Sequence, residues 1–503
     1  MAAFRRRSQA KAGMGKSFSI PASPPFKVSL GKLFAQIVSP ENIREAYRLI
    51  REKHYDPYLQ YYKKFASGID GVDLRDFDDN LEAQLKACRD FLLAEDRPFY
   101  PQILRKVPKD TPGKFREIYL VALRDKVTQK AMALPLVERF EKLYYPNLFS
   151  YRNGRSYGTI AAARRVRKLL QAHDGRLFVY KTDIADYFDN IDQGRLLDML
   201  REALPDEPEV RGLVRQFVHQ RKFWDGHLIS PIRGIPAGSS LSTVFANFYL
   251  WPLDREMFRG DYHYLRYGDD ILLLDPDPAR IEAGSRRIAE VLAGHGLSSS
   301  PHKTLRKAPG EAFEYLGYRF AEGKIHIGSV AMGRFKQWAY EQLVVDRYRD
   351  YSNKTDEERR ALLKKIILDI NTGLAATLGL RQLPWVRAFP VVDDDSSFRR
   401  MDAFIKDRIR LTILRRPSPR NRRLIPEAWF RELGYKSLTG AYHRILRRRS
   451  LAPYRGWRRY FGTNFEMFLQ GREKKEGLAR KWANLKGKLR YVRQALNGEI
   501  KFD

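Results

Sequence analysis

Short apolar runs on either side of a carboxylate pair form the clearest local pattern in the chain. Residues 262–267 and 271–274, around "HYLRYGDDILLL", have the aromatic, β-branched and apolar content of two short strands. Gly268-Asp269 between them has the chemistry of a tight hairpin turn. The pattern predicts a hairpin with Asp269 and Asp270 at its tip, although an ordinary solvated turn would have the same pattern.

A second strand-like run, "GRLFVYKTD", ends at Asp183 and is followed by a helix from about Gln193. If this strand pairs with the hairpin, Asp183 meets Asp269 and Asp270 at one edge of a sheet. The alternative is that Asp183 caps the following helix. Three crowded carboxylates repel one another unless divalent cations lie between them. Two such ions about 4 Å apart are a known arrangement for phosphoryl transfer.

The periodicity changes along the chain and divides it into four parts. Alternating strand and helix signals predict an α+β part, which precedes a mostly helical second half. A helix should begin near Ser39, because Ser followed by Pro is a common helix start. The expected parts are a basic arm with a helical extension (1–65), the α+β part (66–330), a helical part (331–425) and a basic helical C-terminal region (426–503).

Charge is the compositional feature that changes this picture most. The 503 residues contain 93 Lys and Arg against 60 Asp and Glu, a net charge of +33. Such an excess predicts a polyanionic partner, foremost nucleic acid. Residues 401–503 alone carry 27 Lys and Arg against 9 Asp and Glu. There is no apolar run of 18 residues and the N-terminal segment lacks a signal-peptide core, so we expect a soluble, cytoplasmic protein without a membrane partner.

Cysteine and histidine are too few for a zinc module. Cys88 is the one cysteine, and no two of the nine histidines stand four residues apart. Carboxylates should therefore hold any metal, and their oxygens favour hard cations. The expected cofactor is a pair of Mg²⁺ ions, with Mn²⁺ as the alternative, at Asp183, Asp269 and Asp270.

Eight ordered blocks resemble the motifs of reverse transcriptases. The blocks "TDIADYFDNID", "GIPAGSSLSTVFANFYL", "RYGDDILLL", "GLSSSPHKT" and "FEYLGYRF" resemble palm motifs, and "GIDGVD", "GKFREIYLVALRDKVTQKAM" and "YRNGRSYGT" resemble fingers blocks of the group II intron type. The resemblance covers about residues 66–330 and is weaker at 389–410. It implies a right-hand polymerase fold with a helical thumb, RNA-directed DNA polymerase activity, and Asp183, Asp269 and Asp270 as the metal ligands.

The same resemblance implies residues that bind the triphosphate. Lys109 and Arg116 lie on a predicted basic hairpin that could close over phosphates, although surface charges on any hairpin would look alike. Lys303, in "SPHKT", resembles the lysine proposed to protonate the leaving pyrophosphate. A solvated lysine at a helix end is the alternative.

Two further positions bear on the choice of nucleotide. Phe188 lies five residues after Asp183, where reverse transcriptases carry a ring that would collide with a ribose 2′-OH. A core aromatic is the alternative for Phe188. Gly238 is retained in "GIPAGSS" and lets the backbone approach the nucleotide or template. Ala237 replaces the usual Gln beside it, which removes a polar contact to the incoming nucleotide.

Several arginines are candidates for contact with nucleic acid. Arg152 and Arg155, in "YRNGRS", could face phosphates of the template or of the nucleotide. In the C-terminal region, arginines alternate with Tyr454, Trp457 and Tyr460, which offers charges for phosphates and rings for stacking. A solvated basic helix with core aromatics is the alternative. The C-terminal candidates are Arg447, Arg448, Arg449, Arg458 and Arg459.

The kind of reverse transcriptase is less constrained. The divergent "GIPAGSS" block, the complete carboxylate triad and the helical tail resemble the defence-associated, or "unknown group", bacterial reverse transcriptases. That resemblance implies anti-phage cDNA synthesis from dNTPs on a structured non-coding RNA. A splicing maturase without a zinc endonuclease is the main alternative, and an RNA-binding protein with an inactive polymerase fold is a third. The oligomeric state is not indicated.

Overall fold

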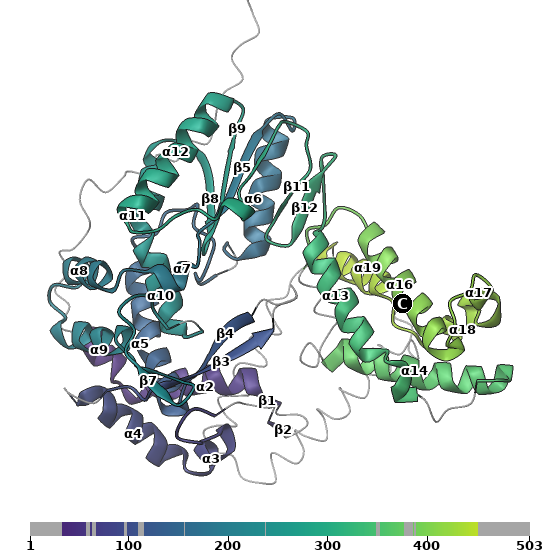
Figure 1. Cartoon of the computed structure of the whole chain (residues 1–503), viewed down its shortest axis with the longest axis horizontal. Coiled ribbons are helices and arrows are strands. Elements are labelled where there is room, and N and C mark those ends of the chain that lie inside the picture. The colour runs from purple at the N-terminus through teal and green to yellow at the C-terminus, as the bar shows by residue number, and fades with distance from the viewer. Residues whose placement is uncertain are drawn as a thin grey trace, which may run out of the picture. The chain divides into compact units, whose positions relative to one another are not determined.

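The computed structural model describes residues 33–56, 61–62, 67–94, 98–108, 115–154, 156–236, 238–348, 353–376, 386 and 389–450 (Figure 1). The chain divides into two compact units, Met1–Tyr435 and Lys436–Asp503. The architecture of the first unit is α+β, as the sequence predicts.

The central element is a four-stranded sheet that carries the predicted hairpin. Its strands in spatial order are β10 (Leu305–Lys307), β5 (Phe178–Asp183), β9 (Asp270–Asp275) and β8 (His263–Tyr267). The strands pair antiparallel, and the predicted pairing of the "GRLFVYKTD" strand with the hairpin is confirmed. Helices near this sheet are α6 (Thr159–Ala172), α7 (Tyr187–Asn190), α11 (Trp251–Arg259) and α12 (Pro278–Gly294), with the short 3-10 turn Pro301–Lys303 before β10 (Figure 1).

The hairpin forms where the sequence alternates between apolar runs and a glycine turn. Leu265 and Ile271 to Leu274 are almost fully buried, so both strands contribute to the core. Gly268 has a φ of +65°, which suits a tight turn between them. The turn therefore holds Asp269 and Asp270 at the end of two well-packed strands.

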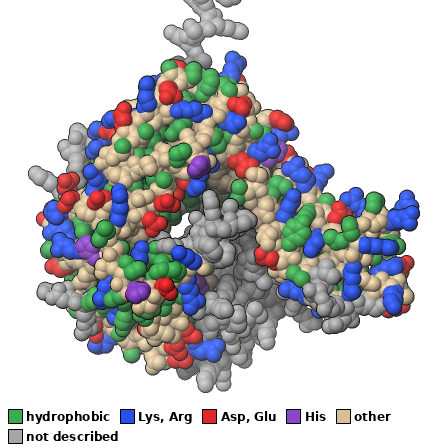
Figure 2. Space-filling view, viewed as in Figure 1, with side chains coloured by type: hydrophobic (Ala, Val, Ile, Leu, Met, Phe, Trp, Pro, Cys, Tyr) green, Lys and Arg blue, Asp and Glu red, His purple; other side chains and the backbone are tan. Residues whose placement is uncertain are grey.

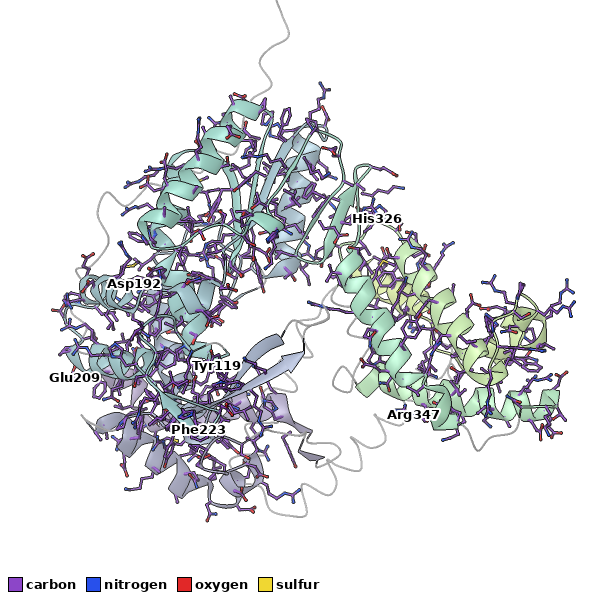
Figure 3. All side chains as sticks on the ribbon, viewed as in Figure 1. Tyr119, Asp192, Glu209, Phe223, His326 and Arg347 are labelled. Atoms are coloured by element: carbon purple, nitrogen blue, oxygen red, sulfur yellow. The ribbon has the colours of Figure 1, made fainter. Side chains whose placement is uncertain are left out.

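A second sheet and a set of helices form the N-terminal half. The sheet has the order β4 (Phe115–Leu120), β3 (Gln102–Pro108), β6 (Lys222–Trp224) and β7 (His227–Ile229). Tyr119 and Phe223 mark two of its strands in Figure 3. A small two-stranded pair, β1 (Tyr55–Asp56) with β2 (Tyr61–Tyr62), lies after α2. The helices are α1 (Leu33–Ile37), α2 (Pro40–His54), α3 (Leu74–Asp79), α4 (Leu81–Leu93), α5 (Leu123–Glu141), α8 (Gln193–Ala203), α9 (Pro208–Val218) and α10 (Ser240–Tyr249).

One hydrophobic core joins these helices to the central sheet. Helix α5 is its axis, because residues such as Leu123, Val127 and Leu136 are fully buried while α1, α2, α4 and α10 pack around it. The predicted start of a helix near Ser39 is confirmed, since the Ser39 hydroxyl accepts a hydrogen bond from the Asn42 amide at 3.2 Å.

The C-terminal part of the first unit is mostly helical. A three-stranded sheet of β11 (Phe313–Tyr315), β12 (Tyr318–Ala321) and β13 (Lys324–Ile327) precedes it. The helical elements are α13 (Ser329–Gln342), the 3-10 turn Val345–Tyr348, α14 (Asp356–Ala376), α16 (Ser396–Leu414), α17 (Asn421–Leu424) and α18 (Glu427–Glu432). Many Lys and Arg side chains lie on the visible face of these helices (Figure 2).

The described part of the second unit, residues 436–450, contains α19 (Leu438–Ser450). The boundaries proposed for a thumb at 331–425 and an RNA-binding region at 426–503 remain predictions. Among the described residues, no helix has the length and apolar content needed to span a bilayer.

Candidate active site

Three carboxylates meet at the ends of β5 and β9. Asp183 is paired in register with Asp270, and Asp269 precedes Asp270 in the turn. One carboxylate oxygen from each residue lies within 4.8 Å of the others. The alternative that Asp183 caps a helix is wrong, because Asp186 and Asp192 occupy the N-cap positions of α7 and α8.

Backbone contacts fix the position of these strand ends. The Ile184 amide donates to the Asp269 carbonyl at 3.3 Å, and the Ser300 amide donates to the Asp183 carbonyl at 2.7 Å. Asp183 is only 5% exposed. The cluster is therefore preorganised by the sheet and by the segment that leads into β10.

The electrostatics of the cluster favour a bound cation. Burial, and then the charge of Asp183, raises the pKa of Asp269 to about 6. Burial also raises the pKa of Asp270, although Lys181 opposes this. The Lys303 ammonium donates to the Asp183 carboxylate. Burial lowers the pKa of Lys303, but the hydrogen bond to Asp183 and the neighbouring carboxylates raise it more.

The donor set fits a hard divalent cation. Three carboxylates with oxygens this close offer the ligands that Mg²⁺ and Mn²⁺ prefer, and they would lose their mutual repulsion when a cation binds. Asp183, Asp269 and Asp270 are the residues that would hold it.

We expect Mg²⁺ binding to weaken as the pH falls through about 6. A carboxylate with a raised pKa is protonated below that pH and cannot bind a metal, so binding near pH 6 should release protons from Asp269. Isothermal titration in two buffers with different ionisation enthalpies measures this release. Asp269→Asn is the control without the titrating group. An affinity that stays constant from about pH 5 to pH 7 would contradict the assignment.

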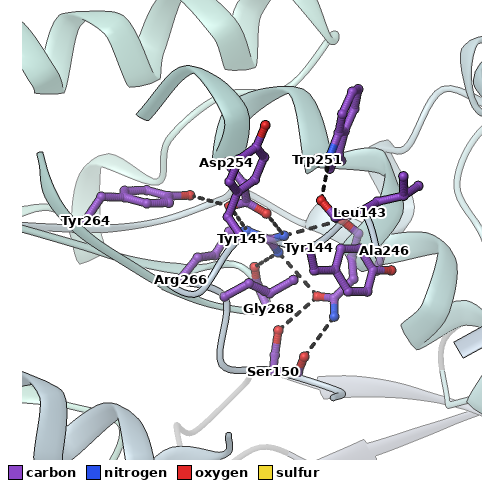
Figure 4. Close-up of polar contacts among 12 residues, drawn as sticks. Leu143, Tyr144, Tyr145, Ser150, Ala246, Trp251, Asp254, Tyr264, Arg266 and Gly268 are labelled. Carbon is purple, nitrogen blue, oxygen red and sulfur yellow. Dashed lines mark hydrogen bonds and ion pairs between the residues drawn. The ribbon is translucent and has the colours of Figure 1, made fainter. Parts of the chain in front are cut away.

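A buried polar network contacts the turn of the hairpin at Gly268 (Figure 4). Arg266, in β8, is 0% exposed, and its Nε and Nη2 donate to the Asp254 carboxylate at 2.8 and 2.5 Å. Its Nη1 donates to the Gly268 carbonyl at 2.9 Å. The Tyr264 hydroxyl also donates to Asp254, at 3.0 Å. Arg266 therefore ties the turn of the hairpin to α11.

The network continues to a loop outside the sheet. Nδ2 of Asn247, in α10, donates to the Ser150 carbonyl at 2.8 Å, and the Ser150 hydroxyl donates to Asn247 Oδ1 at 2.9 Å. Arg266 Nη1 lies 3.4 Å from the same Asn247 oxygen. Sequence patterns did not reveal Arg266, Asp254 and Asn247 as site residues. The sequence feature that could have revealed them is Arg266 itself, a charged residue within a strand-like run. A buried arginine requires an acidic partner.

The loop of "GIPAGSS" is fixed against α7. The Ile235 amide donates to the Phe188 carbonyl at 2.9 Å. Gly234 has a φ of +79°, and a Cβ there would lie 2.9 Å from the Asp189 backbone. Only glycine fits this close approach, which holds the half-buried Phe188 in place. Gly238 also has a positive φ, +89°, but a Cβ there would meet open space.

The other predicted residues lie in several places. Lys303 reaches the carboxylate cluster, and Arg116 lies in β4 opposite Val107. Arg447, Arg448 and Arg449 lie within α19. The predicted residues outside the described part of the chain are Lys109, Arg155, Ala237, Arg458 and Arg459.

The guanidinium of Arg152 contacts other residues of the chain. Its Nη2 donates to Glu141 at 2.7 Å, its Nη1 donates to the Tyr145 carbonyl at 2.7 Å, and its guanidinium lies 3.8 Å from the Tyr157 ring centroid. The side chain is 4% exposed. A phosphate contact would take the buried Arg152 guanidinium away from Glu141, so the position of Arg152 does not support the predicted role.

Comparisons with known proteins show what the region around the cluster is similar to. Residues 107–320 match the family model described as reverse transcriptase (RNA-dependent DNA polymerase). The chain is 23% identical to Protein YkfC of Escherichia coli over 337 residues, which cover 59% of this chain and 85% of that protein. It is 25% identical to the group II intron-encoded protein LtrA of Lactococcus lactis over 225 residues. That match covers 43% of this chain and 36% of LtrA.

Solved structures give a more distant likeness. A telomerase from Candida albicans, in complex with a fragment of telomeric RNA, is 13% identical with a TM-score of 0.40. The alignment covers 72% of this chain and 66% of the telomerase. At this TM-score the similarity supports no functional statement.

Proposed function

We propose that this chain, whose residues 107–320 form a reverse transcriptase domain, copies RNA into DNA at the cluster of Asp183, Asp269 and Asp270. The domain is that of an RNA-directed DNA polymerase, with distant homology to group II intron-encoded proteins. The observation that carries the proposal is the meeting of three carboxylates at paired strand ends inside the matched region.

The proposed reaction joins the primer 3′ oxygen to the α-phosphate of a dNTP and releases pyrophosphate. Asp183, Asp269 and Asp270 would hold two Mg²⁺ ions, or Mn²⁺ in their place, which would supply positive charge for the attacking and leaving oxygens. Lys303, whose ammonium contacts Asp183, would give a proton to the leaving pyrophosphate. Lys109 and Arg116 would bind the triphosphate from the β3–β4 hairpin.

The direct test is primer extension by the purified chain. With an RNA template, a DNA primer, dNTPs and Mg²⁺, we expect DNA products that disappear with EDTA and return with added Mg²⁺ or Mn²⁺. Digestion of the template with RNase before the reaction should abolish them. Failure to extend any primer on RNA with either metal would overturn the proposal.

Phe188→Val should admit ribonucleotides. The loop at Gly234 fixes the backbone of Phe188, and the ring centroid of Phe188 lies 5.6 Å from that of Tyr187, edge-on, so we propose that the Phe188 ring blocks a 2′-OH. We expect the preference for dNTP over rNTP, as a ratio of kcat/KM, to fall roughly tenfold or more. Phe188→Tyr keeps the ring and should keep the preference. Equal use of both nucleotides by the wild type would rule out this role.

We further propose a role in anti-phage defence, with a structured non-coding RNA as template and the cytoplasm as the location. The divergent Ala237 block and the basic C-terminal region support this proposal. The similarity to LtrA favours the alternative, a splicing maturase. A defence enzyme must make DNA, whereas a maturase needs RNA binding alone. In a host, Asp269→Asn should therefore remove phage protection, and an unchanged phenotype would favour the maturase.

Neutralising Arg447, Arg448 and Arg449 to glutamine should weaken RNA binding. For each phosphate that is no longer neutralised, the slope of log affinity against log salt should flatten by about 0.7 to 0.9. Filter binding across a salt series measures the slope, and extension of a saturating short primer–template should survive. An unchanged slope would show that these arginines of α19 do not bind phosphates.

A further inference from the structure

Tyr151 has an unusual backbone conformation beside the catalytic turn. Its φ is +52°, in the left-handed region that residues other than glycine rarely adopt. Such a conformation persists only where the surrounding structure enforces it, and it occurs often at active sites and ligand contacts. Neighbouring parts of the fold must therefore hold Tyr151 in this conformation.

Buried bonds anchor the chain on both sides of Tyr151. Before it, the fully buried Ser150 exchanges two hydrogen bonds with Asn247, and the Phe149 amide donates to the Arg266 carbonyl at 2.9 Å. After it, Arg152 is held by Glu141. The polar network of Figure 4 thus reaches the residue directly before Tyr151. The backbone has little freedom to relax.

These anchors leave the Tyr151 ring beside the carboxylates. Tyr151 is 42% exposed. A Cβ at Gly268 would lie 3.6 Å from its hydroxyl, and its ring centroid is 6.3 Å from that of Tyr267. Burial, and then the charge of Asp269, raises the pKa of the Tyr151 hydroxyl, which agrees with this position. Tyr151 therefore lies beside the turn that carries Asp269 and Asp270.

The other end of the cluster has different neighbours. Lys303 contacts Asp183 there. In phosphoryl transfer the attacking and leaving oxygens lie roughly in line on opposite sides of the phosphorus. If Lys303 marks the side of the leaving pyrophosphate, the attacking 3′-OH lies toward Asp269, Tyr267 and Tyr151.

We propose that the Tyr151 ring is a stacking surface for the 3′-terminal nucleotide of the primer. This rests on the proposed polymerase function and adds a contact residue to it. Base stacking on an exposed ring tolerates any base, as a primer terminus requires. The Ser150–Asn247 contact fixes the backbone before Tyr151, and the left-handed conformation of Tyr151 then directs its ring toward the turn.

The test separates the ring from the strained backbone. Tyr151→Phe keeps the ring, Tyr151→Ala removes it, and Tyr151→Gly removes it and relieves the strain. With 2-aminopurine as the 3′-terminal base of a primer–template, binding to the wild type and Tyr151→Phe should quench its fluorescence. Quenching should be absent in the other two, and their KM for primer–template should rise roughly tenfold or more, with the KM for dNTP little changed. Tyr151→Gly should also melt at a higher temperature than Tyr151→Ala.

Each result has a defined meaning. A rise in the KM for dNTP with an unchanged KM for primer would overturn the proposal in favour of contact with the incoming nucleotide. Equal quenching and kinetics in all four proteins would show that Tyr151 has a structural role only. If the wild type quenches the probe but makes no DNA, the polymerase proposal fails while the stacking surface stands. If the wild type makes DNA but Tyr151→Ala quenches the probe as strongly as the wild type does, the stacking proposal fails while the polymerase proposal stands.

Discussion

Asp269→Asn should reduce DNA synthesis roughly a thousandfold or more, because removal of a metal ligand takes away several kcal/mol of transition-state stabilisation. An amide keeps the size of the side chain but neither carries the charge nor holds a divalent ion in the same way. Asp183→Asn should have a similar effect, since its oxygen belongs to the same cluster. Single-turnover extension of a labelled primer with saturating dNTP measures the loss.

The stability of the same variant distinguishes lost chemistry from misfolding. The pKa of Asp269 is about 6 in the folded chain, above its ordinary value of 3.8. Ionisation of this carboxylate therefore costs more in the folded state, and the metal-free protein loses stability as the pH rises through 6. At pH 7 and without metal, Asp269→Asn should melt at a higher temperature than the wild type. Added Mg²⁺ should raise the melting temperature of the wild type only. Wild-type rates of synthesis in the variant would refute the assignment.

Asp254→Ala should destabilise the fold by about 3 to 5 kcal/mol, since it leaves the guanidinium of Arg266 buried and unpaired. Both side chains are almost completely inaccessible, at 0% and 1%. Urea unfolding followed by fluorescence measures the change. We expect the variant to lose activity as well, because the Arg266 bond to the Gly268 carbonyl depends on this pair.

Helix α11 supplies a matched control two residues away. Glu256 pairs with Arg287 at 2.8 Å, but these side chains are 26% and 47% exposed. Glu256→Ala should therefore cost only about 0 to 1 kcal/mol. Replacing Arg266 and Asp254 together by Met and Leu should restore much of the stability. An Asp254→Ala protein as stable as Glu256→Ala would contradict the role assigned to the buried pair.

Local patterns predict the hairpin that carries Asp269 and Asp270 but not the contacts that support it. The strands around Gly268 are visible in the sequence because apolar runs and a glycine turn are local features. The approach of Asp183 to Asp270 depends on strand pairing over a long separation, and the motif resemblance supplied it. Arg266 finds partners 12 and 19 residues away, and Asn247 finds Ser150 97 residues away. No periodicity encodes those pairs.

Arg152 and Tyr151 show the same limit in neighbouring residues. Arg152 is a candidate from the sequence because arginine often binds phosphate, but Glu141 and two carbonyls occupy its guanidinium. Tyr151 is not a candidate from the sequence, because its left-handed conformation arises from tertiary anchors and has no local signal. Residue type alone could not separate the guanidinium of Arg152, which Glu141 holds, from the exposed Tyr151.

The antiparallel register of β5 and β9 also determines how the chain can tolerate insertions and deletions. Side chains alternate between the two faces of a strand, so one residue added or removed within Phe178–Asp183 would turn the Asp183 position to the opposite face. An insertion or deletion of two residues would return Asp183 to its original face of the strand but would shift its carboxylate by one full repeat along the strand. Length changes within this strand would therefore take Asp183 out of the carboxylate cluster, whereas conservative apolar exchanges at Val179 leave the register intact. For engineering of this enzyme, linkers and tags belong outside the paired strands.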